Sequence, residues 1–246
     1  MSLSTPYELY YWPTIQGRGE FVRLALEEGG VEYIDVARGP DDDRDGFAGM
    51  LELLDGETIV HPPFAPPFLR AGDLMIGQTA NILLFVGAAH GLAPNDDAGR
   101  LWTHQLQLTL ADFLVEIHDT HHPIASSLYY EDQRDEARRR AEHFRKSRAP
   151  KFLGYFEQVV ERNPDASGYL VGAKLTYADL SLFQVVAGLR YAFPRMMKRL
   201  EKKLPRLIAL HDAVAVRPRI AAYLGSQRRL VFNQEGIFRH YKELDG

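Results

Sequence analysis

Apolar and polar positions in the first third of the chain switch between two periods. The runs "YELYY" (7–11) and "VEYIDV" (31–36) are short, rich in aromatic and β-branched residues and typical of strands. Between them, residues 18–28 carry Phe21 and Leu24 at helical spacing. The order strand, helix, strand favours a parallel pair of strands joined by a crossover helix.

A long connection and a second pair of strands follow. Residues 37–67 form an acidic, Gly- and Pro-rich connection, in which the pattern predicts one short helix around 47–54. The turn at 71–73 separates two short apolar runs and predicts an antiparallel hairpin. The segment 78–91 then reads as a helix that ends at glycine. We therefore predict a first domain over residues 1–91.

Beyond a turn-rich linker the pattern is helical only, and no run is a convincing strand. The predicted fold class is an α/β first domain followed by an all-helical second domain over residues 98–246. The helical patterns cover residues 101–119, 132–161 and 176–191, with shorter pieces before and after Pro205 and Pro218.

One predicted helix has a sharp start. In "LTYADLSLF", Thr176 is followed three residues later by Asp179, which is the spacing of a capping box with Asp in place of Glu or Gln. The simplest interpretation of this stretch is structural.

Composition narrows the class of protein. The chain has 246 residues, 46% of them hydrophobic, which is ample for buried cores. With a formal charge of -4 and no basic run interleaved with aromatics, nucleic acid is not an expected partner. No window reaches the roughly 20 apolar residues of a membrane helix and the N-terminus lacks a signal-peptide layout, so we expect a soluble, cytoplasmic protein. The absence of cysteine excludes disulfides, thiolate metal sites and a protein thiol as nucleophile.

Four stretches follow one another along residues 7–226: "YYWPTIQGRGEFVRLAL", "PPFLRAGDLMIGQTANILLFVG", "GYLVGAKLTYADLSLF" and "LPRLIALHDAVAVRPRIAAYLGS". Together they resemble the cytosolic glutathione S-transferases, whose thioredoxin-like first domain precedes a helical domain. The first stretch is similar to the entry of the tyrosine-type classes such as mu, pi, alpha and sigma. The resemblance implies a homodimeric detoxification enzyme that uses glutathione as co-substrate, without a metal, on small apolar electrophiles.

The resemblance implies that a tyrosine at the end of the first strand activates the thiol of glutathione. In the family this tyrosine precedes an aromatic residue, which here selects Tyr11, before Trp12. The turn that follows is one residue longer than usual, so Thr14 is a second candidate, in the manner of the serine-type classes. Tyr10 comes next, and both tyrosines also suit a strand without any chemical role.

The resemblance also implies a clamp on the cysteinyl unit of glutathione. Pro67 corresponds to the cis-proline of the family, and the residue before it offers its backbone N–H and C=O. Here that residue is Pro66, which has no N–H, so half of the clamp is missing. Alternatively, Pro66 only stiffens the loop.

Four further residues are assigned to glutathione by resemblance. Gln78 and Thr79 match the Gln-Ser pair that holds the γ-glutamyl carboxylate at a helix start, a position that suits anions. Asp112 resembles the acid that reaches the γ-glutamyl ammonium of the partner subunit, and Arg18 resembles a residue that steers the glycyl carboxylate. Without the resemblance, Thr79 is an N-cap and both charged residues lie on the surface.

Five residues are candidates for other ligands. His118, His121 and His122 lie at i, i+3 and i+4, on one face of the predicted helix, which invites a metal interpretation that we do not favour. The resemblance places His118 and His122 in the wall of the electrophile pocket, and Trp12 and Ile15 lie in the turn beside the expected thiolate.

The sequence therefore predicts a tyrosine-type glutathione transferase. The alternative is a non-catalytic member that binds ligands or proteins, which the longer turn and Pro66 would favour. Reduction of peroxides by glutathione stays open, whereas disulfide exchange by a protein cysteine is excluded. The aromatic tail around Phe232, Phe238 and Tyr241 is expected to pack back onto the helical domain.

Overall fold

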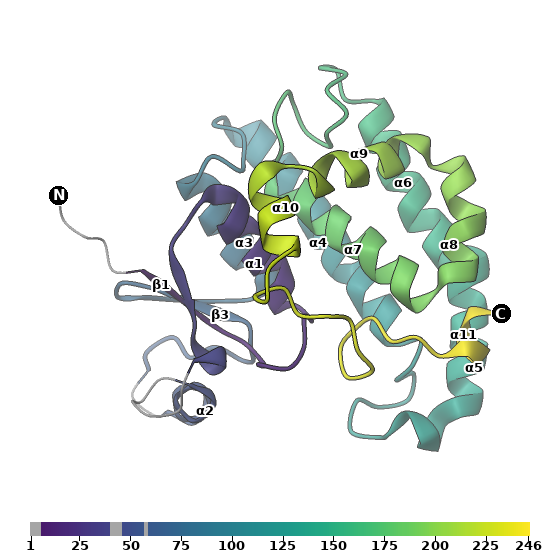
Figure 1. Cartoon of the computed structure of the whole chain (residues 1–246), viewed down its shortest axis with the longest axis horizontal. Helices are drawn as coiled ribbons and strands as arrows, with labels where there is room; N and C mark the ends of the chain where they lie inside the picture. Colours follow the sequence, from purple (N-terminus) through teal and green to yellow (C-terminus); the bar gives the residue numbers. More distant parts are fainter. Residues whose placement is uncertain (1–5, 40–45, 57–58) are drawn as a thin grey trace.

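The computed structural model describes residues 6–39, 46–56 and 59–246 (Figure 1). The acidic run of the predicted connection, residues 40–45, lies outside the described residues. The α/β part comprises β1 (Tyr7–Tyr10), α1 (Gly19–Gly29), β2 (Tyr33–Asp35), a 3-10 turn (Val36–Arg38), α2 (Phe47–Asp55), β3 (Phe68–Ala71), β4 (Leu74–Gly77) and α3 (Thr79–Ala89).

The four strands form one mixed sheet in the order β2-β1-β3-β4. Strand β1 pairs in parallel with β2 and antiparallel with β3, and β3 and β4 form the predicted hairpin. Leu9 faces the larger core with α1 and α3, whereas Tyr10 faces a smaller core that contains Met50 of α2. Successive side chains of β1 therefore point to opposite faces of the sheet.

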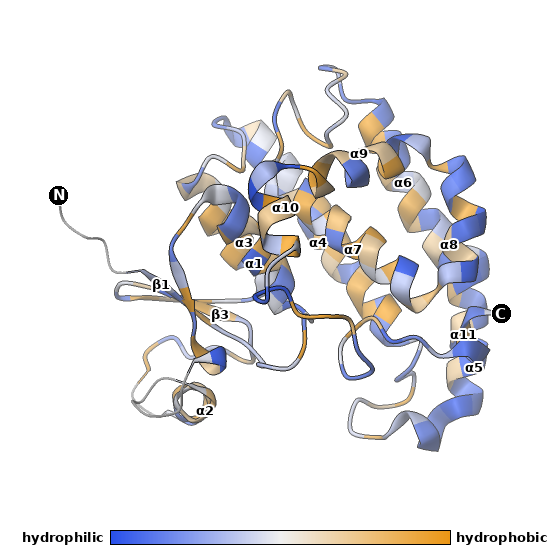
Figure 2. Cartoon of the chain, in the orientation of Figure 1, coloured by the Kyte–Doolittle hydropathy of each residue, from blue (hydrophilic) through white to orange (hydrophobic). Residues whose placement is uncertain are grey.

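The rest of the described chain is helical, as predicted, and Figure 2 shows apolar residues along much of α4 and α7. None of the described helices has the length and apolar character needed to cross a bilayer. The helices are α4 (Asp97–His118), α5 (Arg134–His143), α6 (Ala149–Glu161), α7 (Tyr177–Ala192), α8 (Pro194–Leu200), α9 (Pro205–Ala215), α10 (Pro218–Leu224) and α11 (Lys242–Asp245).

Two helix predictions need correction. The pattern over 132–161 is not one helix: a 3-10 turn at Tyr130–Gln133 precedes α5, and a π-helical turn at Phe144–Arg148 separates α5 from α6. Helix α4 begins four residues before the predicted start, at Asp97, because Asp96 caps it by accepting a hydrogen bond from the Gly99 N–H at 2.8 Å.

Helix α1 lies between the sheet side of the molecule and the helical domain. It packs on α3, and on its other side on α7 and α10. Even its charged residues Glu20 and Arg23 are completely buried, and they are paired with each other at 3.4 Å. A turn that precedes α1 is therefore held by contacts from both parts of the chain.

The C-terminal tail crosses the helical domain, as predicted, and in Figure 1 it runs from α10 to α11 beside α5. Phe232 stacks on Tyr191 with ring centroids 5.1 Å apart, and Tyr241 stacks on Tyr130 at 3.8 Å. Phe238 is buried.

The capping box at the start of α7 is confirmed. The buried Asp179 carboxylate accepts hydrogen bonds from the Thr176 N–H and hydroxyl, both at 2.7 Å, and from the Leu170 N–H at 2.8 Å. Burial raises the pKa of this carboxyl to about 6. One acid thus joins the segment 170–176 to the first turn of α7.

We expect Asp179→Ala to lower the free energy of unfolding by about 2–4 kcal/mol, because two buried N–H groups lose their acceptor. Urea unfolding measures the change. The control is Asp135→Ala, since that carboxylate is exposed and pairs with Arg138 one turn away. Equal stability of the two variants would contradict the structural role of Asp179.

Candidate active site

Three segments meet at one end of the sheet. Tyr10 pairs with Phe68, and Phe68 pairs with Gly77, so the next residues in register are Tyr11, Pro67 and Gln78. The peptide bond between Pro66 and Pro67 is cis, as the resemblance implied. The predicted activating residue, the backbone clamp and the anion site therefore converge although they lie up to 67 residues apart.

The Tyr11 phenol lies beneath the start of α1. Its side chain is buried, and its oxygen accepts a hydrogen bond from the backbone N–H of Arg18 at 2.8 Å. Arg18 is the N-cap residue of α1, so this N–H is one of the donors that the helix itself leaves unsatisfied. The helix start thus polarises the phenol.

The protonation state of Tyr11 suits a hydrogen-bond donor. Burial raises the pKa of the phenol, while the N–H of Arg18 and the positive charges of Arg18 and Arg23 oppose that shift. The phenol consequently keeps its proton at neutral pH. Within the described residues, the phenol oxygen has its hydrogen bond as an acceptor only, which leaves its O–H available to a ligand.

Two glycines make room for the Tyr11 ring. A Cβ on Gly17 would lie 2.0 Å from the phenol oxygen, and a Cβ on Gly19 would lie 2.5 Å from the ring. Gly17 also has a φ of +42°, which side-chain-bearing residues rarely adopt. Tyr11 can therefore pack against this turn only when residues 17 and 19 are glycines.

The two alternative hydroxyls have other partners. Tyr10 donates to the Glu8 carboxylate at 2.6 Å and stacks on Phe68 at 4.6 Å, in the smaller core. Thr14 is exposed and contacts Glu235 of the tail at 3.4 Å. Of the three candidate hydroxyls, that of Tyr11 is the one held by the helix start.

The start of α3 offers uncommitted donors. Gln78 has a φ of +67°, and such strained non-glycine residues cluster at functional sites. Its side chain is exposed and does not cap the helix. The Thr79 hydroxyl is buried without a hydrogen-bond partner among the described residues. A carboxylate bound at this helix start would satisfy these groups, so the pair fits the γ-glutamyl end of glutathione.

The remaining residues predicted to bind glutathione differ in their exposure and in their distance from the phenol. Arg18 is half-buried, and its charge acts on both Tyr11 and His118, so its side chain lies close to the phenol. Pro66 is half-buried beside the cis bond and has only its C=O to offer. Asp112 is exposed on α4.

An open apolar groove adjoins the turn. Trp12 and Ile15 line it together with Phe47 of α2 and Glu235 of the tail, and its volume is about 390 Å³. Trp12 also contacts the Phe47 ring, with centroids 5.8 Å apart. The turn that carries Ile15 thereby forms one side of the groove, and the tail forms the other.

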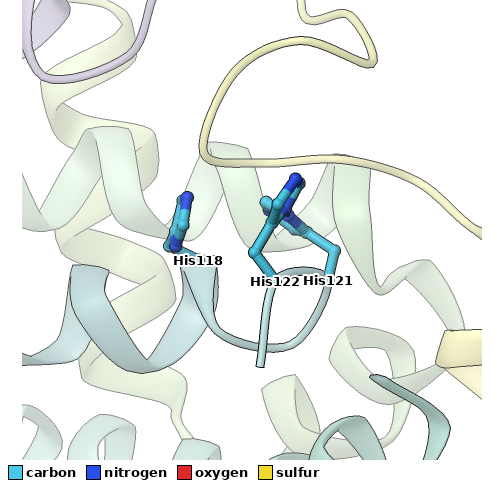
Figure 3. A group of neighbouring side chains, drawn as sticks. All are labelled: His118, His121 and His122. Atoms are coloured by element: carbon cyan, nitrogen blue, oxygen red, sulfur yellow. The ribbon is translucent and has the colours of Figure 1, made fainter. Parts of the chain in front are cut away.

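The three histidines do not share a helix face. Helix α4 ends at His118, and His121 and His122 lie in the turn that follows, because both of their N–H groups bond to the His118 carbonyl. Figure 3 shows the three rings grouped beneath the tail. His121 bonds to the Ile237 carbonyl at 2.8 Å, so the cluster contacts the tail directly.

All three imidazoles are neutral at physiological pH. Burial lowers the pKa of His118, lowers that of His121 to about 2 and lowers that of His122 to about 4. The positive charge of Arg239 lowers all three further. The cluster therefore presents ring lone pairs and N–H donors, not positive charges.

Comparison with known proteins agrees with this geometry. A family model described as the glutathione S-transferase C-terminal domain matches residues 118–227. A glutathione S-transferase of Plasmodium falciparum is 23% identical over 229 residues, which cover 91% of this chain and 97% of that protein. Glutathione S-transferase P 1 of Xenopus laevis is 26% identical over 224 residues, or 91% of this chain and 93% of that protein. These matches support a glutathione S-transferase fold and relationship for this chain.

A solved structure of this family has the same fold. The monomeric glutathione S-transferase of the hookworm Necator americanus matches with a TM-score of 0.67 at 21% identity, and the match covers 93% of this chain and all of that one. The predicted fold class, a thioredoxin-like part followed by helices, is confirmed.

A buried polar network that joins the turn to the helical domain was not predicted. Gln16 of the turn accepts a hydrogen bond from Gln184 of α7 at 2.7 Å and donates to the Leu230 carbonyl of the tail. Gln184 in turn accepts from Arg229 at 2.9 Å, and Arg229 pairs with the buried Glu20. Gln16 is thus fixed by the helical domain and the tail. These partners lie 168 and 214 residues from Gln16, so no local sequence pattern predicts the contacts.

We expect Gly19→Ala to lower the free energy of unfolding by about 1–3 kcal/mol, because the new methyl group overlaps the Tyr11 ring. Thermal unfolding measures the effect. Gly154→Ala is the control: it meets open space inside α6, so it should leave stability unchanged or raise it by about 0.5–1 kcal/mol. If both glycines tolerate alanine equally, Tyr11 does not pack as described.

Proposed function

We propose that this chain is a tyrosine-type glutathione transferase that joins the thiolate of glutathione to small apolar electrophiles. The observation that carries the proposal is the buried Tyr11 phenol, which accepts the Arg18 N–H at 2.8 Å and keeps its own O–H free to donate. The relatives named glutathione S-transferase support the same activity.

Glutathione supplies the sulfur nucleophile, whose thiol has an ordinary pKa of about 8.5. The Tyr11 O–H stabilises the thiolate by donating to it, and a hydrogen bond to a charged acceptor contributes about 1.5–3 kcal/mol. The start of α1 adds about 0.3–1 kcal/mol. A drop of two pKa units requires roughly 2.7 kcal/mol, so these two groups suffice to make most of the bound thiol ionised at neutral pH.

The other assigned residues position the tripeptide. We propose that the start of α3, with Gln78 and Thr79, binds the γ-glutamyl carboxylate, and that the Arg18 guanidinium binds the glycyl carboxylate. Pro66 contributes its carbonyl alone to the cysteinyl unit. The orphaned Thr79 hydroxyl and the strained Gln78 support this placement.

We assign the electrophile to the groove beside the turn. Trp12 and Ile15 supply apolar walls of this groove. His118, on which the charge of Arg18 acts, and His122, whose ring stacks on that of His118, are the polar groups that we assign to the electrophile. A purely ligand-binding role would leave the free O–H of Tyr11 and the uncommitted donors of α3 without a purpose, so the enzyme is the better account. Roles in peroxide reduction and detoxification, and a cytoplasmic location, stay predictions from the sequence.

We expect Tyr11→Phe to lower kcat/KM roughly 10- to 150-fold, which corresponds to the loss of one hydrogen bond of about 1.5–3 kcal/mol to the sulfur. Steady-state kinetics with glutathione and 1-chloro-2,4-dinitrobenzene measures this. Tyr10→Phe is the matched control, because its hydroxyl bonds to Glu8 in the smaller core. A Tyr11→Phe enzyme as active as wild type would sink the assignment, and Thr14→Ala would then be tested.

We also propose that the chain is a homodimer, although the hookworm relative is monomeric. Leu101, Leu108 and Val115 of α4 are exposed and lie seven residues apart, so they form one apolar stripe. Asp112 follows Leu108 by one helical turn on the same face. A partner that covers the stripe would receive Asp112, as its proposed role toward the partner's glutathione requires.

A second feature supports self-association. The Phe64 ring, in the loop before the cis bond, is 94% exposed, which is unusual for a large apolar side chain. An apolar pocket of about 210 Å³ lies between α4 and α6 and is lined by Thr109, Phe152 and Tyr155 together with Lys151. A ring on one subunit and a pocket on the other form a complementary pair that twofold symmetry would repeat.

We expect Phe64→Ser to shift the protein from dimer to monomer in analytical ultracentrifugation, because the interface loses a buried ring on each side. Val216→Ser is the control, as this exposed valine lies at the end of α9, away from α4. A wild-type protein that is monomeric at micromolar concentration would refute the dimer and leave the Tyr11 chemistry unaffected.

A further inference from the structure

The histidines at the end of α4 form a compact group of nitrogen atoms. One ring nitrogen of each of His118, His121 and His122 lies within 4.8 Å of the other two, and Figure 3 shows the rings gathered on one side of the turn. The group comes from a stretch of five residues, and it is partly to fully buried. Imidazole is the donor that zinc, copper and nickel accept most readily.

The hydrogen bonds of His121 fix its tautomer. A carbonyl oxygen only accepts, so the Nε2 that lies 2.8 Å from the Ile237 oxygen carries the proton. The Nδ1 of this neutral ring therefore carries a lone pair, which accepts a hydrogen bond from the Nδ1–H of His122 at 2.5 Å and is turned toward the other rings. A histidine that donates one N–H to a backbone carbonyl and directs its other nitrogen inward is oriented as metal-binding histidines are.

His118 is oriented in the same way by an acid. Its Nδ1 lies 3.4 Å from the Asp119 carboxylate, which makes Nδ1 the donor and leaves the lone pair on Nε2. The carboxylate–histidine pair is the other common support of a metal-bound imidazole. Two of the three rings thus have an acceptor on the outer nitrogen and a lone pair on the other.

We propose that His118, His121 and His122 bind one divalent transition-metal ion, with Zn²⁺ as the expected occupant. Zinc–nitrogen bonds of about 2.0–2.1 Å in tetrahedral geometry place the nitrogens roughly 3.3 Å apart. The widest separation here is 4.8 Å, so the rings must close by about 1.5 Å. His118 is the ring with room to turn, because it is half-buried at the helix end. A fourth position stays open to water.

The charges around the cluster are balanced. Arg239 acts on all three rings and Arg18 acts on His118, and both disfavour a cation. Asp119 acts on His118 and Glu131 on His122, and both favour it. A metal at this place would also tie the turn after α4 to the tail, since His121 holds the Ile237 carbonyl.

The experiment uses full-length protein without a histidine tag, freed of metal by a chelator and titrated with Zn²⁺ in a calorimeter, in the absence of glutathione. Wild type should bind one Zn²⁺ per chain, and Zn²⁺ should raise its Tm. Co²⁺ in place of Zn²⁺ should give the visible absorption of a nitrogen-bound, low-coordinate ion.

His118→Gln and His122→Gln should each weaken Zn²⁺ binding by at least 100-fold, since loss of an outer hydrogen-bond partner alone costs about 10–100-fold. Asp119→Asn should give that intermediate loss. His143→Gln is the control, because this exposed histidine lies on α5 outside the cluster. Circular dichroism checks that each variant is folded, and His121, which is buried, is left intact.

The proposal is overturned if wild type binds no Zn²⁺ at micromolar concentration. It is also overturned if His118→Gln and His122→Gln bind as wild type does, because the ion then sits elsewhere. Neither result decides the transferase proposal, which rests on Tyr11 and is tested separately by the kinetics of Tyr11→Phe without added metal.

Discussion

The hydrogen bond from the Arg18 N–H to the Tyr11 oxygen is the interaction on which the account of the site depends. It fixes the phenol against the start of α1, occupies one lone pair of the oxygen and leaves the O–H to a ligand. The bond exists only because Gly17 and Gly19 let the backbone pass within contact of the ring. The two glycines of the turn therefore allow the backbone conformation that holds Tyr11, and that conformation leaves the O–H of Tyr11 available to a thiolate.

The same constraint explains why both parts of the chain are needed for one site. The turn before α1 is fixed from the helical side by Gln16, which bonds to Gln184 and to the tail. Behind it, the fully buried Glu20 is satisfied by Tyr223 at 2.7 Å and by two arginines. A buried carboxylate without such partners would cost several kcal/mol, so these contacts stabilise the turn as well as the fold.

The features that could be predicted from the sequence are those that lie within a single short motif. The cis bond at Pro67 and the capping box at Asp179 each lie in a short motif, and the structure contains both features. Tyr11 lies in a third motif, and its role toward glutathione stays a prediction. The hydrogen bond from the Arg18 backbone N–H to Tyr11 was not predicted, because the sequence pattern assigned a role to the Arg18 side chain and says nothing about its backbone. The turn at His121 was read as helix, since i, i+3, i+4 spacing fits both.

Contacts between residues far apart in the sequence could not be predicted from the sequence. Ile237 lies 116 residues after His121, and Leu230 lies 214 residues after Gln16, so no periodicity links them.

The most direct test of the central claim is a pH titration of the thiolate absorbance of enzyme-bound glutathione. The account predicts an apparent pKa about two units below that of the free thiol. A bound thiol that titrates near its free value would contradict it.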